Sequence, residues 1–309
     1  MRFLLLSLML GLSGCAPALG RIMVTAPNQL NPFASDTSLP PSARQVLGVD
    51  QQFHVNVGPP DASLCVSVIE PTQRKTPCGT VLVLHGIWNS SVWMLPTARM
   101  LADAGFRSVL VDLRGHGQSS GDWLTYGIQE SKDISQVINE LERRRLVQGP
   151  LGVYGISYGA TTSIHLAGID DRIQAVVAVA PFSAMRDVVP DYSRTVLPGV
   201  ERLISDNHLQ EAVDASGENA SFDPDQSSAL KAIQQTDAPV LIIHGTDDWL
   251  VPPYHALRLH EAAPKRSKLV FIPKTGHIKI WFDPSGEVAV HARNWFTRWL
   301  TQESPPTKN

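Results

Sequence analysis

Six short apolar runs, each followed by a polar turn, constrain the fold of this chain more than any other feature. Runs of four to six mostly apolar residues are typical of strands that are buried on both faces of a parallel sheet. We therefore expect a central sheet made mainly of parallel strands. The six runs occupy residues 80–84, 108–111, 151–154, 175–180, 239–243 and 268–272.

Segments with helical periodicity separate these runs. In residues 130–145, for example, Ile134, Val137, Ile138 and Leu141 recur at a spacing that places them on one helix face. Strands that alternate with helices predict a doubly wound α/β fold with right-handed crossovers. The expected helices cover residues 94–104, 130–145, 253–263 and 288–300, and another begins near residue 160.

Two further strands are expected before the parallel part of the sheet. Residues 53–57 and 64–69 alternate apolar and polar side chains, as half-buried strands do, and residues 58–61 supply the turn between them. With this hairpin the sheet has eight strands and is mostly parallel. Ligands in such sheets bind at the carboxyl ends of the strands, which is where the polar clusters of this chain lie.

The composition argues against several classes of protein. The chain has 309 residues, a hydrophobic content of 43% and a charged content of 18%, which suits a globular domain. The net charge is −3 and neither half of the chain is strongly basic, whereas phosphate binding needs a concentrated basic face, so nucleic acid is not expected as a partner. Neither cysteine in the body of the chain lies near a histidine cluster with metal-ligand spacing, and neither a metal nor an organic cofactor is expected.

The chain is expected to contain one large domain with short flanking segments. The domain should cover residues 46–301, followed by a polar tail at 302–309. Residues 183–235 contain no strand pattern and predict a helical lid insertion, with short helices that could cover residues 200–204 and 209–215.

The first residues carry the pattern of an export signal. A charged start, a short apolar core and small residues predict that residues 1–14 are removed. Residues 12–15 resemble the lipobox of bacterial lipoproteins, which implies a lipid anchor on Cys15 and a membrane-anchored lipoprotein on the periplasmic or cell-surface face. A plain secretory signal with an incidental cysteine is the alternative. Residues 15–45 are rich in proline, serine and asparagine and predict a tether or an arm that wraps the domain.

Two cysteines remain in the expected exported chain. Cys65 and Cys78 flank a short polar connection, and an oxidising compartment would allow a disulfide between them. Two buried thiols are the alternative.

The pattern Gly-x-Ser-x-Gly at residues 155–159 lies between an apolar run and a helical segment. A serine on such a strand–turn–helix is the nucleophile of many hydrolases, because the sharp turn exposes its hydroxyl. The helix N-terminus behind it supplies N–H groups for a developing oxyanion. The pattern makes Ser157 a candidate nucleophile, and an ordinary glycine-rich turn is the alternative.

Further motifs lie at the ends of other apolar runs, and together they resemble the α/β-hydrolase superfamily of esterases, lipases and serine peptidases. The resemblance covers residues 53 to 300, and the motifs occur in the order of that family. They are His-Gly at 85–86, Asp-Leu-Arg-Gly-His-Gly at 112–117, Gly-Ile-Ser-Tyr-Gly at 155–159, His-Gly-Thr-Asp-Asp-Trp-Leu-Val-Pro at 244–252 and Thr-Gly-His at 275–277.

The resemblance implies a Ser-His-Asp triad. Ser157 would be the nucleophile, and His277, on a glycine-containing loop after the last strand, would be the general base and then the general acid. Two adjacent aspartates could orient the imidazolium. Asp248 fits the family spacing, in which two residues and then Val-Pro follow the acid, and Asp247 is the alternative.

The resemblance also implies an oxyanion hole formed by two backbone N–H groups. Tyr158, directly after the nucleophile, would supply the first, and Ile87 the second, with Trp88 as the alternative. Four tryptophans in or beside strand-end loops could line an apolar acyl pocket or simply pack against the domain: Trp88, Trp93, Trp123 and Trp249.

Taken together, these motifs predict a carboxylesterase-like serine hydrolase. It would cleave a carboxylic ester, a small molecule or one with a short acyl group, through an acyl-enzyme. A serine peptidase and a thioesterase on the same fold are alternatives, because the elbow does not distinguish them. A non-catalytic surface binding protein built on a hydrolase fold is an alternative of another class.

Overall fold

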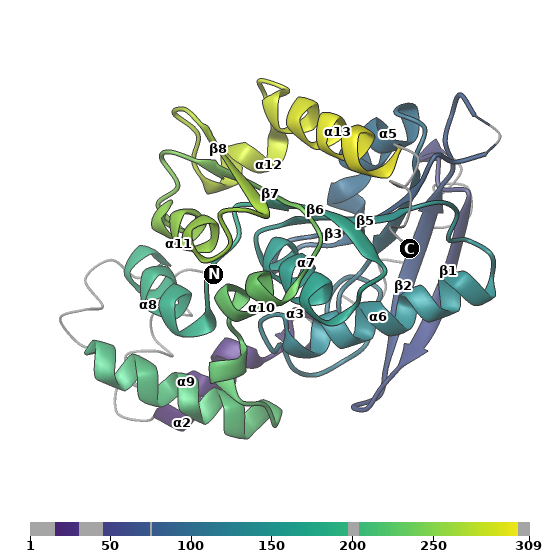
Figure 1. The fold of residues 1–309 in the computed structure, drawn as a ribbon. Coiled ribbons are helices and arrows are strands. Elements are labelled where there is room, and N and C mark those ends of the chain that lie inside the picture. The colour runs from purple at the N-terminus through teal and green to yellow at the C-terminus, as the bar shows by residue number, and fades with distance from the viewer. Residues whose placement is uncertain (1–15, 31–45, 75, 197–203, 302–309) are drawn as a thin grey trace, which may run out of the picture.

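A computed structural model describes residues 16–30, 46–74, 76–196 and 204–301 (Figure 1). The expected signal peptide, the expected tail and the second half of the expected tether lie outside these ranges. Among the described residues, no helix has the length and apolar character needed to cross a membrane.

Within the described ranges the sheet has eight strands in the order β1-β2-β4-β3-β5-β6-β7-β8. The strands are β1 Gln51–Val57, β2 Ala62–Ile69, β3 Thr80–Leu84, β4 Arg107–Val111, β5 Leu151–Ile156, β6 Ile173–Val179, β7 Val240–Gly245 and β8 Ser267–Ile272. β2 pairs antiparallel with β1 and with β4, and the other pairings are parallel. The expected mostly parallel α/β fold is confirmed, because the continuous apolar runs form central strands that are buried on both faces.

Helices cover both faces of the sheet, as Figure 1 shows. They are α5 Leu95–Asp103, α6 Ile128–Arg143, α7 Tyr158–Ile169, α10 Ala229–Gln235, α11 Tyr254–Ala262, α12 His277–Phe282 and α13 Glu287–Leu300. On one face α6, α7, α10 and α11 share an apolar core with strand residues such as Leu82 and Val109. Neighbouring strand residues such as Val83 and Leu110 point to the other face, where they pack against α5 and α13.

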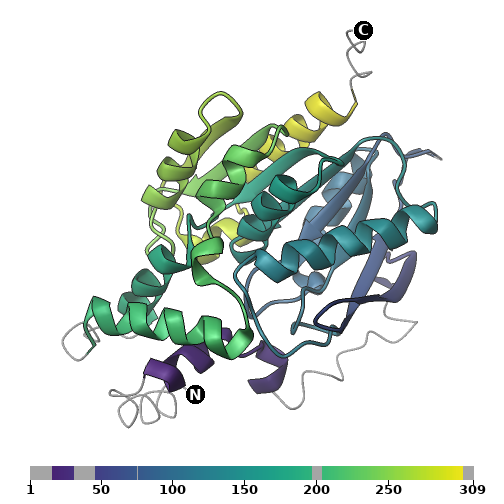
Figure 2. The same ribbon diagram turned by 60° about the horizontal axis from the view of Figure 1, so that its bottom comes forward.

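Residues 185–235 form a helical insertion between β6 and β7, drawn in teal and green in Figure 2. The insertion contains α8 Met185–Val196, α9 Asp206–Ala220, a 3₁₀ helix at Pro224–Gln226, and α10. The helix expected over residues 209–215 lies within the longer α9. Its N-cap is Ser205, whose side chain accepts a hydrogen bond from the N–H of His208. The other short helix expected here lies almost entirely outside the described residues.

Residues 16–30 form an arm packed on this insertion, as both views show (Figures 1 and 2). The arm consists of α2 Ala16–Val24 and α3 Pro27–Leu30. α2 lies so close to α9 that a Cβ on Gly20 would be 2.4 Å from the carbonyl oxygen of Ala212. The Asn28 amide donates two hydrogen bonds to carbonyls of the loop after β4, at 3.1 and 2.9 Å. These residues therefore wrap the domain and are not a tether.

Cys65 and Cys78 do not form a disulfide. The carbonyl of Cys65 accepts a hydrogen bond from the N–H of Asp112 just after β4, whereas the N–H of Cys78 donates to Gly105 just before β4. The length of β4 thus separates the two cysteines, and a disulfide requires Cα atoms within about 7 Å of each other. The Cys78 thiol instead donates a hydrogen bond to the Gly105 carbonyl at 3.1 Å.

Candidate active site

Ser157 lies on a sharp turn between β5 and α7, where the Gly-x-Ser-x-Gly pattern predicts it. Its φ of 54° falls in the left-handed region that serine rarely adopts. A Cβ on Gly155 would lie 2.1 Å from the carbonyl oxygen of Gly159, and one on Gly159 would lie 2.5 Å from that of Leu84. Both glycines are therefore required, and the enclosed turn fixes the direction of the serine side chain.

His277 connects Ser157 to Asp248 through two hydrogen bonds. Its Nε2 lies 2.9 Å from Ser157 Oγ, and its Nδ1 lies 2.7 Å from Asp248 Oδ2. The three residues follow β5, β7 and β8, so the parallel sheet brings them together at the carboxyl ends of its strands. Each is at most 3% exposed. Such an arrangement can move a proton from the serine hydroxyl to the imidazole while the carboxylate orients the ring.

His277 begins a helix, where a loop is expected from the sequence. Gly276 is its extended N-cap, with φ −95° and ψ 175°, and α12 follows directly. A helix this short has too few turns for its periodicity to be recognised in the sequence. Helix α12 also places Trp281 at the site, a residue that the sequence did not point to. The Trp281 ring meets the His277 ring edge-on, with centroids 5.5 Å apart.

Asp248 contacts His277, and its neighbour Asp247 does not. The Asp247 side chain is exposed, and its carboxylate accepts a hydrogen bond from the Thr246 hydroxyl at 2.8 Å. The other oxygen of Asp248 accepts hydrogen bonds from the N–H groups of Leu250 and Val251, at 3.1 and 2.9 Å. The sequence favours Asp248 because Val-Pro follows it at the family spacing. The valine of that pair, Val251, is one of the two residues whose N–H groups hold the Asp248 carboxylate.

A second histidine, His244, also contacts the Asp248 carboxylate. Its Nε2 lies 3.2 Å from Asp248 Oδ2 and 2.8 Å from the carbonyl oxygen of Val251. Burial alone would raise the pKa of Asp248, but the hydrogen bonds from His244 and His277 outweigh it and hold the pKa well below its usual range. Asp248 is therefore ionised at neutral pH. Nothing in the sequence motif at 244–252 reveals this contact.

The histidines of the two earlier motifs, His85 and His116, hold strand-end loops. The Nε2 of His85 accepts a hydrogen bond from the N–H of Leu113 at 3.0 Å, and the Nδ1 of His116 lies 2.9 Å from the carbonyl oxygen of Arg114. Burial lowers the pKa of His85 to about 4 and that of His116 to about 3. Both rings are therefore neutral at pH 7 and serve as hydrogen-bonding groups.

Two backbone segments face Ser157. Tyr158 begins α7, so its N–H is one of those that a helix leaves without a carbonyl acceptor. On the other segment, a Cβ on Gly86 would lie 3.5 Å from Ser157 Cβ. The backbone at Gly86 therefore lies close to the serine side chain. Ile87 and Trp88, the two candidates for the second oxyanion donor, directly follow Gly86 in the chain.

The Tyr158 side chain is anchored in a buried network. Its hydroxyl donates a hydrogen bond to Glu130 at 2.8 Å and accepts one from the N–H of Tyr126 at 3.0 Å. Glu130 also accepts hydrogen bonds from the N–H groups of Thr125 and Gly127, each at 2.9 Å. The network fixes the residue that carries the first expected oxyanion donor. Thr125 and Gly127 are sequence neighbours of Glu130, whereas its contact with Tyr158 joins residues 28 positions apart and has no local signal in the sequence.

Four exposed aromatic side chains lie on segments that also contribute to the site or directly follow it. Trp88, Trp93 and Trp249 are 61%, 62% and 64% exposed, and Phe282 is 65% exposed and lies edge-on to Trp93 with ring centroids 6.4 Å apart. We call these four residues the aromatic rim. Trp249 directly follows Asp248, so the rim adjoins the hydrogen-bonded chain. Three of the four tryptophans considered from the sequence are thus exposed and do not pack in the core.

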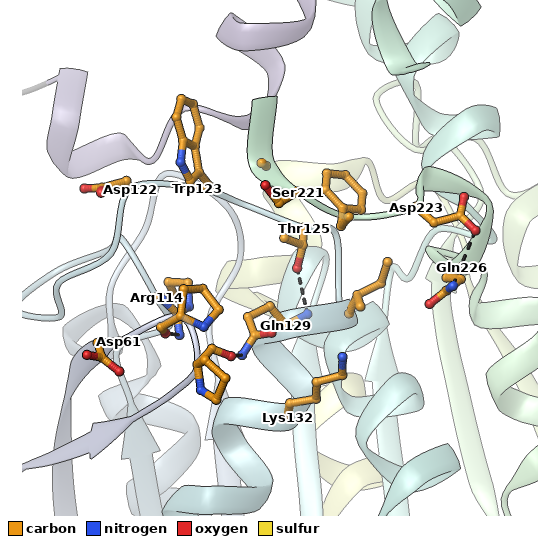
Figure 3. A pocket seen from close by; sticks show the side chains of 15 residues that line it. Asp61, Arg114, Asp122, Trp123, Thr125, Gln129, Lys132, Ser221, Asp223 and Gln226 are labelled. Atoms are coloured by element: carbon orange, nitrogen blue, oxygen red, sulfur yellow. Dashed lines mark hydrogen bonds between the residues drawn. The ribbon is translucent and has the colours of Figure 1, made fainter. Parts of the chain in front are cut away.

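A pocket of about 600 Å³ lies apart from this site (Figure 3). Its walls come from the turn between β1 and β2, the start of α6 and the segment after α9. Trp123, the fourth of those tryptophans, lines it together with Arg114, whose Nε donates a hydrogen bond to Asp133 at 2.7 Å. Ser157 and His277 do not line this pocket, so it is distinct from the hydrogen-bonded chain.

Two protein-family models match the chain. Residues 61–213 match the model described as X-Pro dipeptidyl-peptidase (S15 family), and residues 209–284 match the model described as alpha/beta hydrolase fold. Together the two matches run from β2 to α12.

Curated relatives and solved structures show the same similarity. The uncharacterized protein YqkD of Bacillus subtilis is 28% identical over 202 residues, which are 64% of this chain and 64% of that protein. The esterase YjfP of Escherichia coli is 27% identical over 212 residues, which are 64% of this chain and 80% of that protein. The esterase Pf2001 of Pyrococcus furiosus superimposes with a TM-score of 0.64 at 20% identity, over 83% of this chain and 95% of that one. The chain spans somewhat less than two thirds of the length of YqkD.

The chain belongs to the α/β-hydrolase superfamily of serine hydrolases. The sheet order, the strand-end motifs and the family models agree on this. The proteins and models that it resembles include an esterase and an X-Pro dipeptidyl-peptidase family model.

Proposed function

We propose that this protein is a serine hydrolase that cleaves carboxylic esters, with Ser157, His277 and Asp248 as its catalytic triad. The observation that carries the proposal is the continuous hydrogen-bonded chain from Ser157 Oγ through His277 to Asp248 Oδ2. Burial of all three groups keeps water from competing for these bonds.

In the first half of the reaction, Ser157 becomes acylated. His277 Nε2 takes the hydroxyl proton while Ser157 Oγ attacks the ester carbonyl carbon. The electron pair of the carbonyl moves to its oxygen, which accepts hydrogen bonds from the N–H groups of Tyr158 and Ile87. The bond to the alcohol oxygen then breaks, and His277 gives its proton to that oxygen. Asp248, held ionised, stabilises the imidazolium that forms in between.

In the second half, water releases the acid. His277 takes a proton from water while the water oxygen attacks the acyl carbon. The new tetrahedral intermediate uses the same N–H donors and collapses with loss of Ser157 Oγ, which recovers its proton from His277. The products are the carboxylic acid and the alcohol, and the protein returns to its starting state.

The aromatic rim supports an ester with an apolar acyl or alcohol part. Aromatic side chains exposed by more than 60% beside the site offer contact surface to an apolar group that approaches Ser157. YjfP and Pf2001, two proteins similar to this chain, are named esterases, which favours an ester over an amide.

A panel of chromogenic substrates tests this proposal. We expect 4-nitrophenyl esters of increasing acyl length to be hydrolysed with a higher kcat/KM than any aminoacyl 4-nitroanilide, because the alcohol leaves more easily than an amine and the rim favours an apolar acyl chain. The measurement is the initial rate of nitrophenol or nitroaniline release by wild type. The opposite preference would favour a serine peptidase, the alternative that the S15 family model supports.

We propose further that the protein is held at a bacterial membrane by a lipid on Cys15. The support is the resemblance of residues 12–15 to a lipobox, and these residues lie outside the described ranges. A Cys15→Ser variant is expected to move from the membrane pellet to the supernatant, since each buried methylene of an acyl chain contributes about 0.8 kcal/mol to membrane binding. Cell fractionation with metabolic labelling by a fatty acid measures this. Cys78→Ser is the control and should stay in the pellet; a Cys15→Ser protein that still pellets with membranes would refute the anchor.

A further inference from the structure

The indole ring of Trp281 packs directly against the imidazole of the proposed base. Trp281 follows His277 by four residues on α12, and residues four apart share a helix face. The two rings meet edge-on, with centroids 5.5 Å apart and planes inclined by 63°, an arrangement that aromatic pairs prefer. The indole also packs against the apolar core shared with α5 and α13. The body of the domain therefore holds the indole, and the indole limits how far the imidazole can turn.

The same indole touches the backbone that leads to the second expected oxyanion donor. A Cβ placed on Gly86 would lie 3.2 Å from Cζ2 and 3.4 Å from Cη2 of Trp281, and 3.5 Å from Ser157 Cβ. The outer edge of the indole therefore lies close against the Gly86 backbone, beside the serine. Ile87 and Trp88, the two donor candidates, directly follow Gly86.

The N–H group of the Trp281 indole is buried and has no hydrogen-bond partner within the described part of the chain. A buried donor without an acceptor is destabilising, so phenylalanine would suit this position better if apolar packing were the only requirement. A phenylalanine ring, however, reaches less far from the backbone. What the indole adds is its outer ring, and that ring makes the contact with Gly86.

We propose that Trp281 is a positioning residue of the active site, which acts through His277 and through the loop that begins at Gly86. Proton transfer from Ser157 Oγ to His277 Nε2 depends on their separation of 2.9 Å. The carbonyl oxygen of the substrate must meet the oxyanion donors while that proton moves. A single rigid side chain in contact with both the base and the loop keeps the two events aligned. This inference rests on the proposed acyl-transfer function and adds a residue outside the triad to it.

A Trp281→Leu variant tests the inference, because it removes the ring and keeps an apolar side chain. We expect kcat toward the best 4-nitrophenyl ester to fall by about tenfold with KM changed by less than about twofold, since the base and the oxyanion loop serve the transition state more than the bound ester. The rate at which a fluorophosphonate labels Ser157 should fall by a similar factor, because that reaction uses the same base and donors. Trp281→Phe keeps a ring beside His277 and should recover part of the loss.

Trp295→Leu is the matched control. Trp295 on α13 packs against the same apolar core, and its indole N–H also lacks a partner among the described residues, but its ring neighbour is Trp299, with centroids 5.8 Å apart. The unfolding midpoint should fall in both leucine variants, whereas kcat should fall in Trp281→Leu alone. If wild type hydrolyses esters and Trp281→Leu keeps kcat within twofold, the inference is wrong and the proposed function stands. An equal loss of kcat in both variants would also overturn it, since lowered stability would then explain the loss.

A double-mutant cycle tests the contact with Gly86 and does not depend on the folding of a leucine variant. Gly86→Ala should lower kcat in an otherwise wild-type protein, because the new methyl group would press on the indole at 3.2 Å from Cζ2. In the Trp281→Phe background that space is open, and the fall in kcat should be at least threefold smaller. An equal fall in both backgrounds would overturn the inference. A wild type without hydrolase activity would refute the proposed function and the inference with it.

Discussion

Replacing Ser157 with alanine is expected to lower kcat toward a carboxylic ester by about 10⁶-fold, the scale that follows loss of a serine nucleophile. Without Oγ no acyl-enzyme forms, and His277 has no hydroxyl proton to accept. The same variant should lose covalent labelling by a fluorophosphonate, which reacts with activated serines. Initial rates with the preferred 4-nitrophenyl ester and gel fluorescence after labelling measure the two effects.

Ser216→Ala is the control for this experiment. Ser216 is fully buried in α9, and its hydroxyl donates to the carbonyl of Val213 in the same helix at 2.6 Å. Its alanine variant should be labelled and active like wild type. A wild type that resists labelling, or a Ser157→Ala protein labelled as strongly as wild type, would refute the enzyme proposal in favour of a non-catalytic binding protein.

Replacing Asp248 with asparagine is expected to lower kcat by about 10⁴-fold. The carboxylate accepts the Nδ1 proton of His277 and so keeps Nε2 ready to accept the proton of Ser157. An asparagine amide can donate to Nδ1 instead, which favours the imidazole tautomer that cannot act as a base, and it carries no charge to stabilise the imidazolium. Steady-state kinetics with the best ester measures the loss, and circular dichroism checks that the loop held by Leu250 and Val251 is still folded.

Asp247→Asn provides the matched control, one residue away. Its carboxylate is exposed and interacts with Thr246, so kcat should remain within a few-fold of wild type. A large loss in Asp247→Asn with an active Asp248→Asn would show that the acid in solution is Asp247.

Much of the fold follows from the sequence, because the apolar runs leave few alternatives. A run such as residues 80–84 is apolar on both faces, so it fits a central parallel strand and not a half-exposed one. Once the strands are parallel, their carboxyl ends share one edge of the sheet. Motifs as distant as those of Ser157 and His277 must then meet there, which is why the sequence could predict that both residues and Asp248 lie close together.

The rest of the site depends on packing between distant elements. The insertion carries no motif, and its helix α8 is held by hydrogen bonds from α11 to Asp191 and Asp187. His244 contacts Asp248 across a turn, which a reading of periodicity does not reveal. The composition of residues 15–45 left a tether and a wrapping arm as alternatives, and only the close packing of Gly20 against α9 distinguishes them for residues 16–30.

The packing of the arm on the insertion has a consequence for the order in which the protein is assembled. Among the described helices, α2 leaves the ribosome first. Gly20 of α2, however, packs against Ala212, and the carbonyl of Val24 accepts a hydrogen bond from the N–H of Leu124. The arm therefore cannot take its final position until most of the chain has been made. This early helix is thus among the last to dock on the domain. Its docking brings together residues far apart in sequence, and contacts of that kind slow folding.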